Sequence, residues 1–226
     1  MDLIRYETIL EFLKESRVTT PAQSVFKALS NRDTPETGRP REPGVRIHDD
    51  KEKVALVWDY HSCKIVHEDM ASYDDCIQKT IILLHKIKSV VPIPKLSSRR
   101  VIMYWILATK KYDFKSLELK YRENFIKEST IFDNCFDSSV IMEMKRDKWV
   151  LHHQSGAMDV AQLQSSYKTF KIKEGHPKLF LFLETTITSK EVVEYSSEGM
   201  KDFLLSSYQI GKSHSDAFQN TMEELL

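Results

Sequence analysis

The chain has 226 residues and a mass of 26.4 kDa, with 41% hydrophobic, 29% charged and 10% aromatic residues. A chain of this length buries roughly 70% of its unfolded surface, so it supports a full core without disulfides. Lys and Arg number 33 and Asp and Glu number 33, a balance that excludes a protein whose main task is to coat nucleic acid or an anionic membrane. Only 6 Gly and 7 Pro occur, which excludes collagen-like and linker-dominated chains.

The N-terminus and the cysteines indicate the compartment. Residues 1–7 (MDLIRYE) carry acidic and aromatic side chains where a signal peptide has a basic start and an apolar run. No stretch approaches the roughly 18 apolar residues that a membrane span needs. Cys63, Cys76 and Cys135 are too few, and odd in number, for a secreted disulfide framework. We therefore expect a cytoplasmic, reduced protein without membrane contact.

The first segment, residues 3–16, predicts a short amphipathic helix, because its apolar residues recur at helical spacing. These residues are Leu3, Tyr6, Leu10 and Leu13. Ser30–Gly44 then holds three prolines and two glycines among charged residues. Such a composition cannot bury enough apolar surface to fix its backbone, so we expect a mobile loop there.

The pattern changes in the next part of the chain. Val54–Trp58 and Cys63–His67 are predicted strands joined by a turn. Ser72 is typical of a helix N-cap, and the helix that follows it is expected to end near Val90, before two prolines. Val101–Thr109 is apolar on both alternating faces, which is typical of a central strand that is covered on each side.

The second half of the chain repeats this order. Ser139–Lys145 and Lys148–His153 predict a hairpin, Tyr167–Lys173 alternates as a strand does, and Lys178–Ile187 is the strongest predicted strand. The last segment has apolar residues at helical spacing, and Gly211 lies on the same stripe as these residues. A glycine there predicts a close crossing of this helix over the sheet.

The arrangement as a whole indicates an α+β fold, because runs of strands followed by helices favour antiparallel sheets with helices on one face. An apolar strand followed by an amphipathic helix occurs twice, from Val54 and from Leu179. The interpretation is an internal duplication, or two instances of a common unit, with each antiparallel sheet packed on a long helix. Residues 1–44 then hold the N-terminal helix and the Pro-rich loop, and residues 45–226 form the α+β domain, with similar lobes at about 45–128 and 129–226.

The sequence shows no motif for catalysis. Gly211-Lys212-Ser213 matches the end of a phosphate-binding P-loop, but Ser206 stands where that loop needs its first glycine, and the surrounding pattern is helical. There is no G-x-S-x-G or H-E-x-x-H motif. Cys76, Cys135 and His214 lie among apolar residues, which predicts packing roles. We expect no catalytic residue and no cofactor; an enzyme whose site carries no motif stays open as an alternative.

His61, Cys63 and His67 are the weak metal candidates. Residues two and six apart lie on one face of an extended strand, and zinc accepts these ligand types. Neighbouring positions on one face of a strand are about 7 Å apart, however, and tightly spaced zinc ligands usually lie on turns. The pattern therefore favours a solvent-facing strand dotted with histidines, and we expect no metal.

Charge is distributed unevenly along the chain. Residues 86–127 carry eleven Lys and Arg against three acidic residues, and residues 184–226 carry eight acidic residues against three lysines. The candidate binding residues for an anion or a nucleic acid are Arg99, Arg100, Lys110 and Lys111. They flank the predicted central strand at its two ends, about 30 Å apart when extended, which favours a groove over one phosphate pocket. The alternative is that these charges pair with one another or are solvated.

The layout resembles an uncharacterised, sporadically distributed family of bacterial two-lobed α+β proteins, over roughly residues 45–226. The resemblance rests on the strand pair, Ser72-Tyr73 opening a helix, Arg99-Arg100-Val101 leading an apolar strand, and His214 and Phe218 in the last helix. The chain departs from the family in its predicted N-terminal helix, where the family has a strand, and it lacks the family's Tyr-x-Asn after Tyr104. The resemblance implies a bacterial accessory protein and no catalytic residues.

The function that we predict is that of a non-enzymatic, soluble binding or interaction protein, of the kind encoded with a mobile or defence system. A protein partner or self-association is expected, because such apolar strands favour pairing at a sheet edge. The first alternative is nucleic-acid binding through residues 86–127, with an affinity that falls steeply with salt. The second is the enzyme with an unrecognised site.

Overall fold

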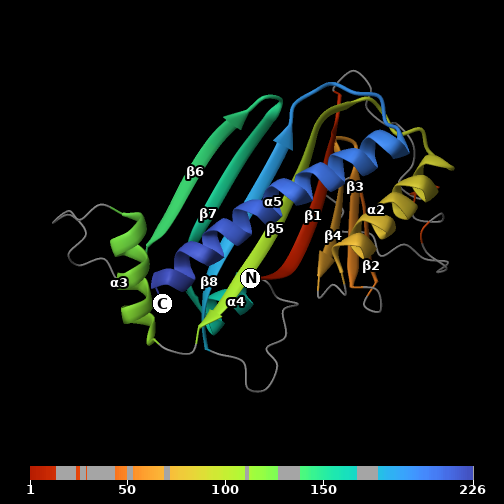
Figure 1. Ribbon diagram of the computed structural model, residues 1–226. Coiled ribbons are helices and arrows are strands. Elements are labelled where there is room, and N and C mark those ends of the chain that lie inside the picture. The colour runs from red at the N-terminus through yellow and green to blue at the C-terminus, as the bar shows by residue number, and fades with distance from the viewer. Residues whose placement is uncertain are drawn as a thin grey trace.

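The computed structural model describes residues 1–13, 24–25, 29, 44–49, 53–68, 72–109, 112–126, 138–166 and 178–225. Its strands are β1 (Asp2–Phe12), β2 (Gly44–Asp49), β3 (Val54–Asp59), β4 (Ser62–Glu68), β5 (Leu96–Thr109), β6 (Ser139–Arg146), β7 (Trp149–Asp159) and β8 (Leu179–Ser189). They form one eight-stranded sheet in the order β2-β3-β4-β1-β5-β8-β7-β6, and every neighbouring pair is antiparallel (Figure 1).

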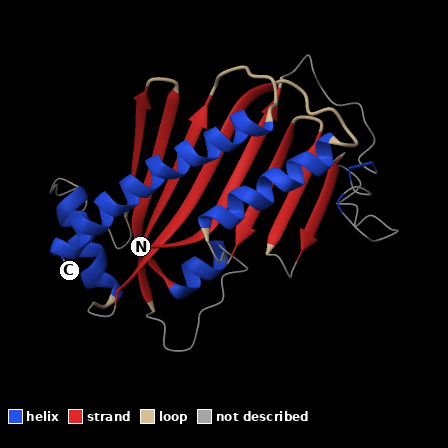
Figure 2. Cartoon of the chain, turned by 45° about the vertical axis from the view of Figure 1, so that its right-hand side comes forward, coloured by secondary structure: helices blue, strands red, loops and turns tan. Residues whose placement is uncertain are grey.

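Four helices pack on this sheet, which makes the fold α+β. They are α2 (Tyr73–Lys88), α3 (Phe114–Phe125), α4 (Val160–Ser166) and α5 (Ser197–Leu225). The two longest, α2 and α5, run across the same face of the sheet (Figure 2). On that face α3 packs beside the C-terminal part of α5, whereas α4 covers one end of the other face through Leu163. None of these helices is long and apolar enough to cross a membrane.

The prediction of two lobes is wrong, because all eight strands belong to a single continuous sheet. Strand β1 lies between β4 and β5 and pairs with both of them. Outward from the β1–β5 pair, the strands follow in the orders β1-β4-β3-β2 and β5-β8-β7-β6. Along the chain, β4 is the last strand of the first set and is followed by α2, and β8 is the last strand of the second set and is followed by α5. The repetition is therefore present as two topologically equivalent halves, which join edge to edge instead of forming separate cores.

The predicted helix over residues 3–16 is also wrong, because residues 2–12 form strand β1. One face of β1 is buried against the helices with the strict alternation of a strand: Tyr6, Thr8, Leu10 and Phe12. The opposite face carries charged residues that pair with neighbouring strands. Residues 14–20 lie outside the described residues.

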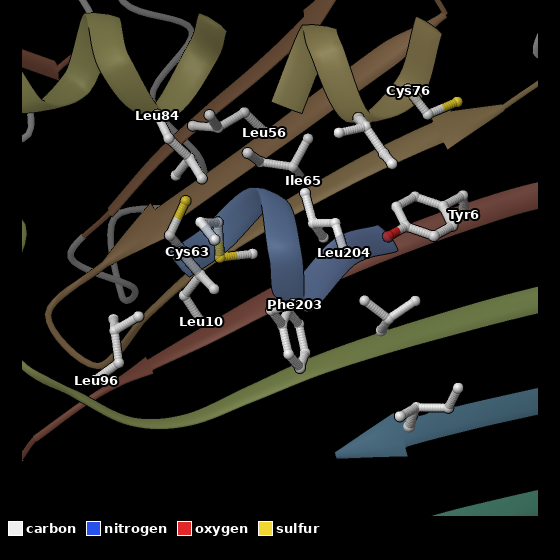
Figure 3. Close-up of a cluster of buried hydrophobic side chains, with 14 of the residues drawn as sticks. Tyr6, Leu10, Leu56, Cys63, Ile65, Cys76, Leu84, Leu96, Phe203 and Leu204 are labelled. Atoms are coloured by element: carbon white, nitrogen blue, oxygen red, sulfur yellow. The ribbon is translucent and has the colours of Figure 1, made fainter. Parts of the chain in front are cut away.

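The main core lies between the sheet and helices α2 and α5 (Figure 3). Strand residues such as Leu10 and Ile65 contact Leu84 of α2 and Leu204 of α5 in one cluster. Cys76 belongs to this cluster as a buried free thiol, which agrees with the packing role predicted for it. Cys135 lies outside the described residues.

The predicted close crossing at Gly211 is confirmed. A Cβ atom added at Gly211 would lie 2.1 Å from Met103 Cε and 2.8 Å from Met103 Sδ. Carbon atoms in van der Waals contact are about 3.5–4.0 Å apart. No side chain larger than hydrogen fits there without displacing Met103, so glycine lets α5 approach β5 closely.

Most of the other predicted elements are confirmed with small shifts. Ser72 caps α2, since its Oγ accepts a hydrogen bond of 3.2 Å from the Asp75 N–H, and the helix ends at Lys88. The β6–β7 hairpin turns at Asp147, whose φ of 51° is in the left-handed region. The predicted strand Tyr167–Lys173 lies outside the described residues, and so does the predicted loop Ser30–Gly44 except for Gly44, which begins β2.

Candidate functional site

Arg99 and Arg100 were predicted to share one binding surface, but they point to opposite faces of the sheet. Successive side chains of a strand alternate between faces. Arg99 lies on the face covered by α5 and is 8% exposed, whereas Arg100 lies on the other face and donates to Glu11 Oε1 at 3.1 Å. Lys110 and Lys111 lie outside the described residues. The structure therefore does not bring the two arginines together.

The rest of the basic segment is also dispersed. Lys86 and Lys88 end α2, while Lys120 and Arg122 belong to α3, at the opposite end of the sheet in Figure 1. Lys95 forms an ion pair of 2.8 Å with Glu194. The described members of residues 86–127 thus line no single groove.

On the face opposite α2 and α5, the arginine and lysine of the central strands are matched by carboxylates. Glu7 is 2% exposed; it accepts from Arg5 Nε at 2.7 Å and lies 2.5 Å from Lys64 Nζ. Arg5 Nη1 donates to Glu68 at 2.9 Å. This ionic network leaves little unbalanced positive charge for a phosphate backbone.

The three weak metal candidates do not form a metal site. His61 is exposed in the β3–β4 turn, and its backbone N–H donates to Asp59 Oδ1 at 2.7 Å. Cys63 and His67 are buried beneath the helices, so the expectation of a solvent-facing strand is wrong for both of them. Among the residues that the structure describes, no group of three His, Cys, Asp or Glu side chains is placed to hold a metal ion.

Burial sets the chemistry of these two side chains. Burial raises the pKa of the Cys63 thiol, so this cysteine stays protonated at neutral pH. Burial, together with the nearby charge of Lys79, lowers the pKa of His67 to about 4. His67 Nε2 lies 2.8 Å from Thr80 Oγ1. A neutral histidine that is hydrogen-bonded to a threonine of α2 links β4 to this helix, which is a structural role.

A second buried histidine, His153 of β7, lies outside the site residues that the sequence predicts. Its ring stacks on that of His214 of α5, with 4.6 Å between centroids, and its Nδ1 lies 3.1 Å from Thr185 Oγ1. Burial, together with His214 and His152, lowers the pKa of His153 to about 4, and burial also lowers the pKa of His214. Both rings of the stack are therefore neutral near pH 7, and no carboxylate is positioned to make them an acid–base pair among the described contacts.

Strand β6 forms an edge of the sheet that no described part of the chain covers. Seven of its eight residues are exposed, and Val140 is half-buried. The exposed side chains include Ile141 at 59%, Met142 at 44% and Met144 at 38%. Edge strands present unpaired N–H and C=O groups, and natural proteins usually protect them. The only charged residues in β6 are Glu143, Lys145 and Arg146.

No family model matches this chain, and no curated protein matches it. The resemblance to the bacterial family therefore stays a prediction. One departure from that family depended on the predicted N-terminal helix. This departure does not exist, because residues 2–12 form a strand.

Proposed function

We propose that this protein is a non-enzymatic interaction protein that self-associates by pairing β6 of one copy with β6 of a second copy. The single observation that supports this function is the exposure of seven of the eight residues of β6, with three apolar side chains at least 38% exposed. Pairing across a two-fold axis would extend each sheet into the other and cover the free backbone groups of both edges.

The sequence of β6 favours one register for pairing with a second copy of itself. A two-fold antiparallel register is defined by the residue that lies opposite itself. A register centred on Glu143 places two glutamates opposite each other, which is unfavourable. A register centred on Met142 places Val140 opposite Met144 and pairs residues 139–145 along their full length, without like charges directly opposite.

A register centred on Met144 is the competitor, because it places Glu143 opposite Lys145 twice. Exposed ion pairs contribute only about 0.2–1 kcal/mol each, and this register pairs residues 142–146 alone. Each further backbone hydrogen bond contributes about 0.5–1.5 kcal/mol, and each apolar cross-strand pair about 0.2–1 kcal/mol. The longer overlap outweighs the ion pairs, so the Met142 register is favoured.

Light scattering coupled to size-exclusion chromatography tests this function. We expect a dimer that dissociates on dilution, and a monomer for Met142→Glu, because that change adds a charge to the centre of the pair. Leu119→Glu on α3 is the matched control, since Leu119 is 42% exposed and should leave the dimer intact. A wild-type protein that stays monomeric at all concentrations, or equal loss of the dimer in both variants, refutes the proposal.

Disulfide trapping tests the register separately. Two copies of a cysteine that lies opposite itself have Cα atoms close enough to oxidise, since disulfides need about 4.4–6.8 Å. Met142→Cys should therefore form a covalent dimer under mild oxidation much faster than Met144→Cys. The reverse order would move the centre of the pair to Met144.

Nucleic-acid binding draws less support, because Arg99 is buried and Arg100 and Lys95 are paired with glutamates. Retention on heparin gives a direct comparison. We expect elution at low salt, and binding with a steep salt dependence would favour the nucleic-acid function over the interaction function.

A further inference from the structure

The guanidinium of Arg99 is buried without a full set of hydrogen-bond partners. It has three hydrogen bonds: Nη1 donates to Gly199 O at 3.4 Å, and Nη2 donates to Ser189 Oγ and to Glu191 Oε2, each at 3.5 Å. Charge-assisted bonds are normally about 2.7–2.9 Å. In the described part of the chain, Arg99 Nε has no partner. A guanidinium has five N–H donors, so this one is under-coordinated.

Arg5 shows what a satisfied arginine looks like in the same sheet. Its Nε donates to Glu7 at 2.7 Å, and its Nη1 donates to Glu68 at 2.9 Å. Arg99 is more deeply buried than Arg5, whose side chain is 21% exposed against 10% for Arg99. The more buried arginine therefore has the longer hydrogen bonds, which is the reverse of what desolvation requires.

A cavity of about 250 Å³ lies beside Arg99, at the point where the β8–α5 connection meets the first turn of α5. Its lining residues are Leu96, Arg99, Val193, Glu194, Tyr195, Ser196, Gly199 and Met200. A water molecule takes about 30 Å³ of liquid volume, so a small anion fits in this space. Phe203 closes another side of the guanidinium, since its ring centroid lies 4.7 Å from Arg99 Cζ.

The cavity is also bordered by further hydrogen-bond donors. The first N–H groups of a helix lack partners within the helix and carry the positive end of its dipole. Ser196 caps α5 by accepting from the Gly199 N–H at 3.1 Å, and the N–H groups of Ser197 and Glu198 precede that bond. The Tyr195 hydroxyl is buried and has no hydrogen-bond partner among the described residues, although the Ser197 side chain lies near it. Burial raises the pKa of Tyr195, so it stays protonated.

Two carboxylates at the rim do not cancel the charge of Arg99. Glu194 pairs with Lys95 at 2.8 Å, and Glu191 lies 3.4 Å from Lys148 Nζ. Glu191 also lies 3.5 Å from Arg99 Nη2, so Arg99, Lys95 and Lys148 together exceed these two carboxylates by one positive charge next to the helix terminus.

We propose that this cavity binds a small oxyanion, a phosphate or a carboxylate group, between the Arg99 guanidinium and the N-terminus of α5. The oxyanion would accept from Arg99 and from the first backbone N–H groups of α5, with the Tyr195 hydroxyl as a further donor. Helix N-termini and arginine forks are established sites for such groups. The site lies away from β6, so its test does not depend on the dimer.

Thermal unfolding with sodium phosphate and with sodium acetate, each against sodium chloride of equal ionic strength, tests the site. A ligand that binds only the folded state raises Tm in a saturable way. We expect such a rise with at least one of the two anions, and isothermal titration should give the same dissociation constant. A response to phosphate alone, to acetate alone or to both identifies which oxyanion chemistry the cavity accepts.

Two neighbouring arginines provide matched variants. Arg99→Met should abolish the rise in Tm with the anion and should also raise Tm in chloride, because it removes an under-coordinated buried charge. Arg100→Met, on the opposite face, should keep the full response. Tyr195→Phe should weaken binding several-fold. If Arg99→Met does not fold, Arg99→Lys replaces it in the test. Lysine keeps the charge but loses the planar fork, so Arg99→Lys should also weaken binding several-fold.

Three results would overturn the site: no saturable response to either anion, a response that persists in Arg99→Met, or an equal loss in Arg99→Met and Arg100→Met. The last result would indicate general screening of surface charge. If Arg99 instead serves only to hold Glu191, Arg99→Met lowers Tm in chloride, and phosphate and acetate give no rise in the wild type.

Discussion

The contact between Gly211 and Met103 gives the sharpest prediction about stability. In Gly211→Ala the new Cβ lies 2.1 Å from Met103 Cε, so the fully buried Met103 side chain has to move by roughly 1.5 Å to restore van der Waals contact. Overpacking of this kind costs about 1–3 kcal/mol. Alanine is favoured over glycine within a helix by about 1 kcal/mol, so we expect a net loss of up to about 2 kcal/mol in the free energy of unfolding.

A double-mutant cycle with Met103→Val separates these two effects. Valine lacks the two atoms that the new Cβ meets, while Thr185 Cγ2, at 3.8 Å, stays at an ordinary distance. In the Met103→Val background Gly211→Ala should therefore stabilise the protein by about 0.5–1 kcal/mol, which reflects helix propensity alone. Urea unfolding followed by circular dichroism gives the free energy of unfolding of all four proteins. The reasoning is refuted if Gly211→Ala has the same effect in both backgrounds.

Three further predictions concern pH, a helix cap and the thiols. The folded pKa values of His67 and His153 are about 4 against about 6.5 in the unfolded chain. Unfolding therefore takes up protons below pH 6.5, so the free energy of unfolding should fall by up to about 3 kcal/mol for each histidine between pH 6.5 and 4; a urea midpoint that stays constant between pH 7 and 5 contradicts this. Ser72→Ala should cost about 1 kcal/mol in urea unfolding, and Ser72→Asp should cost almost nothing; equal losses would show that the cap does not stabilise α2. Cys63 and Cys76 should react with maleimide only in urea, as peptide mass mapping can show, because both are buried thiols of raised pKa; rapid labelling of the folded protein would contradict their burial.

The first strand shows why part of the fold was misread from the sequence. Leu3, Tyr6 and Leu10 fit a helical spacing, but the face of β1 that is buried consists of Tyr6, Thr8, Leu10 and Phe12. The polar Thr8 interrupts the apolar alternation that would have indicated a strand. Tertiary contacts decide the structure here, because β4 and β5 provide partners for β1 on both sides.

That error also explains the predicted lobes. Strands β3, β4, β6, β7 and β8, and most of β5, were recognisable from local patterns, and so were α2 and α5. The pairing of strands depends on contacts between residues far apart in the sequence, which those patterns do not carry. Once β1 was taken as a helix, no strand remained to join β4 to β5. The two equivalent halves then had the pattern of separate units, although the sheet is continuous through β1.

The candidate site was predictable only in part, and Arg99 and Glu7 show where the limit lies. The alternation of a strand already places Arg99 and Arg100 on opposite faces, so their separation could have been predicted from the sequence. Whether a buried charge has a partner of opposite charge could not have been predicted, because that depends on the register of neighbouring strands. Glu7 is 2% exposed, and the β1–β4 pairing brings Lys64 within 2.5 Å of it. The carboxylate partner of Arg99, Glu191, is 3.5 Å away. This difference between two buried charges in one sheet is the physical basis for expecting a ligand at Arg99 and none at Glu7.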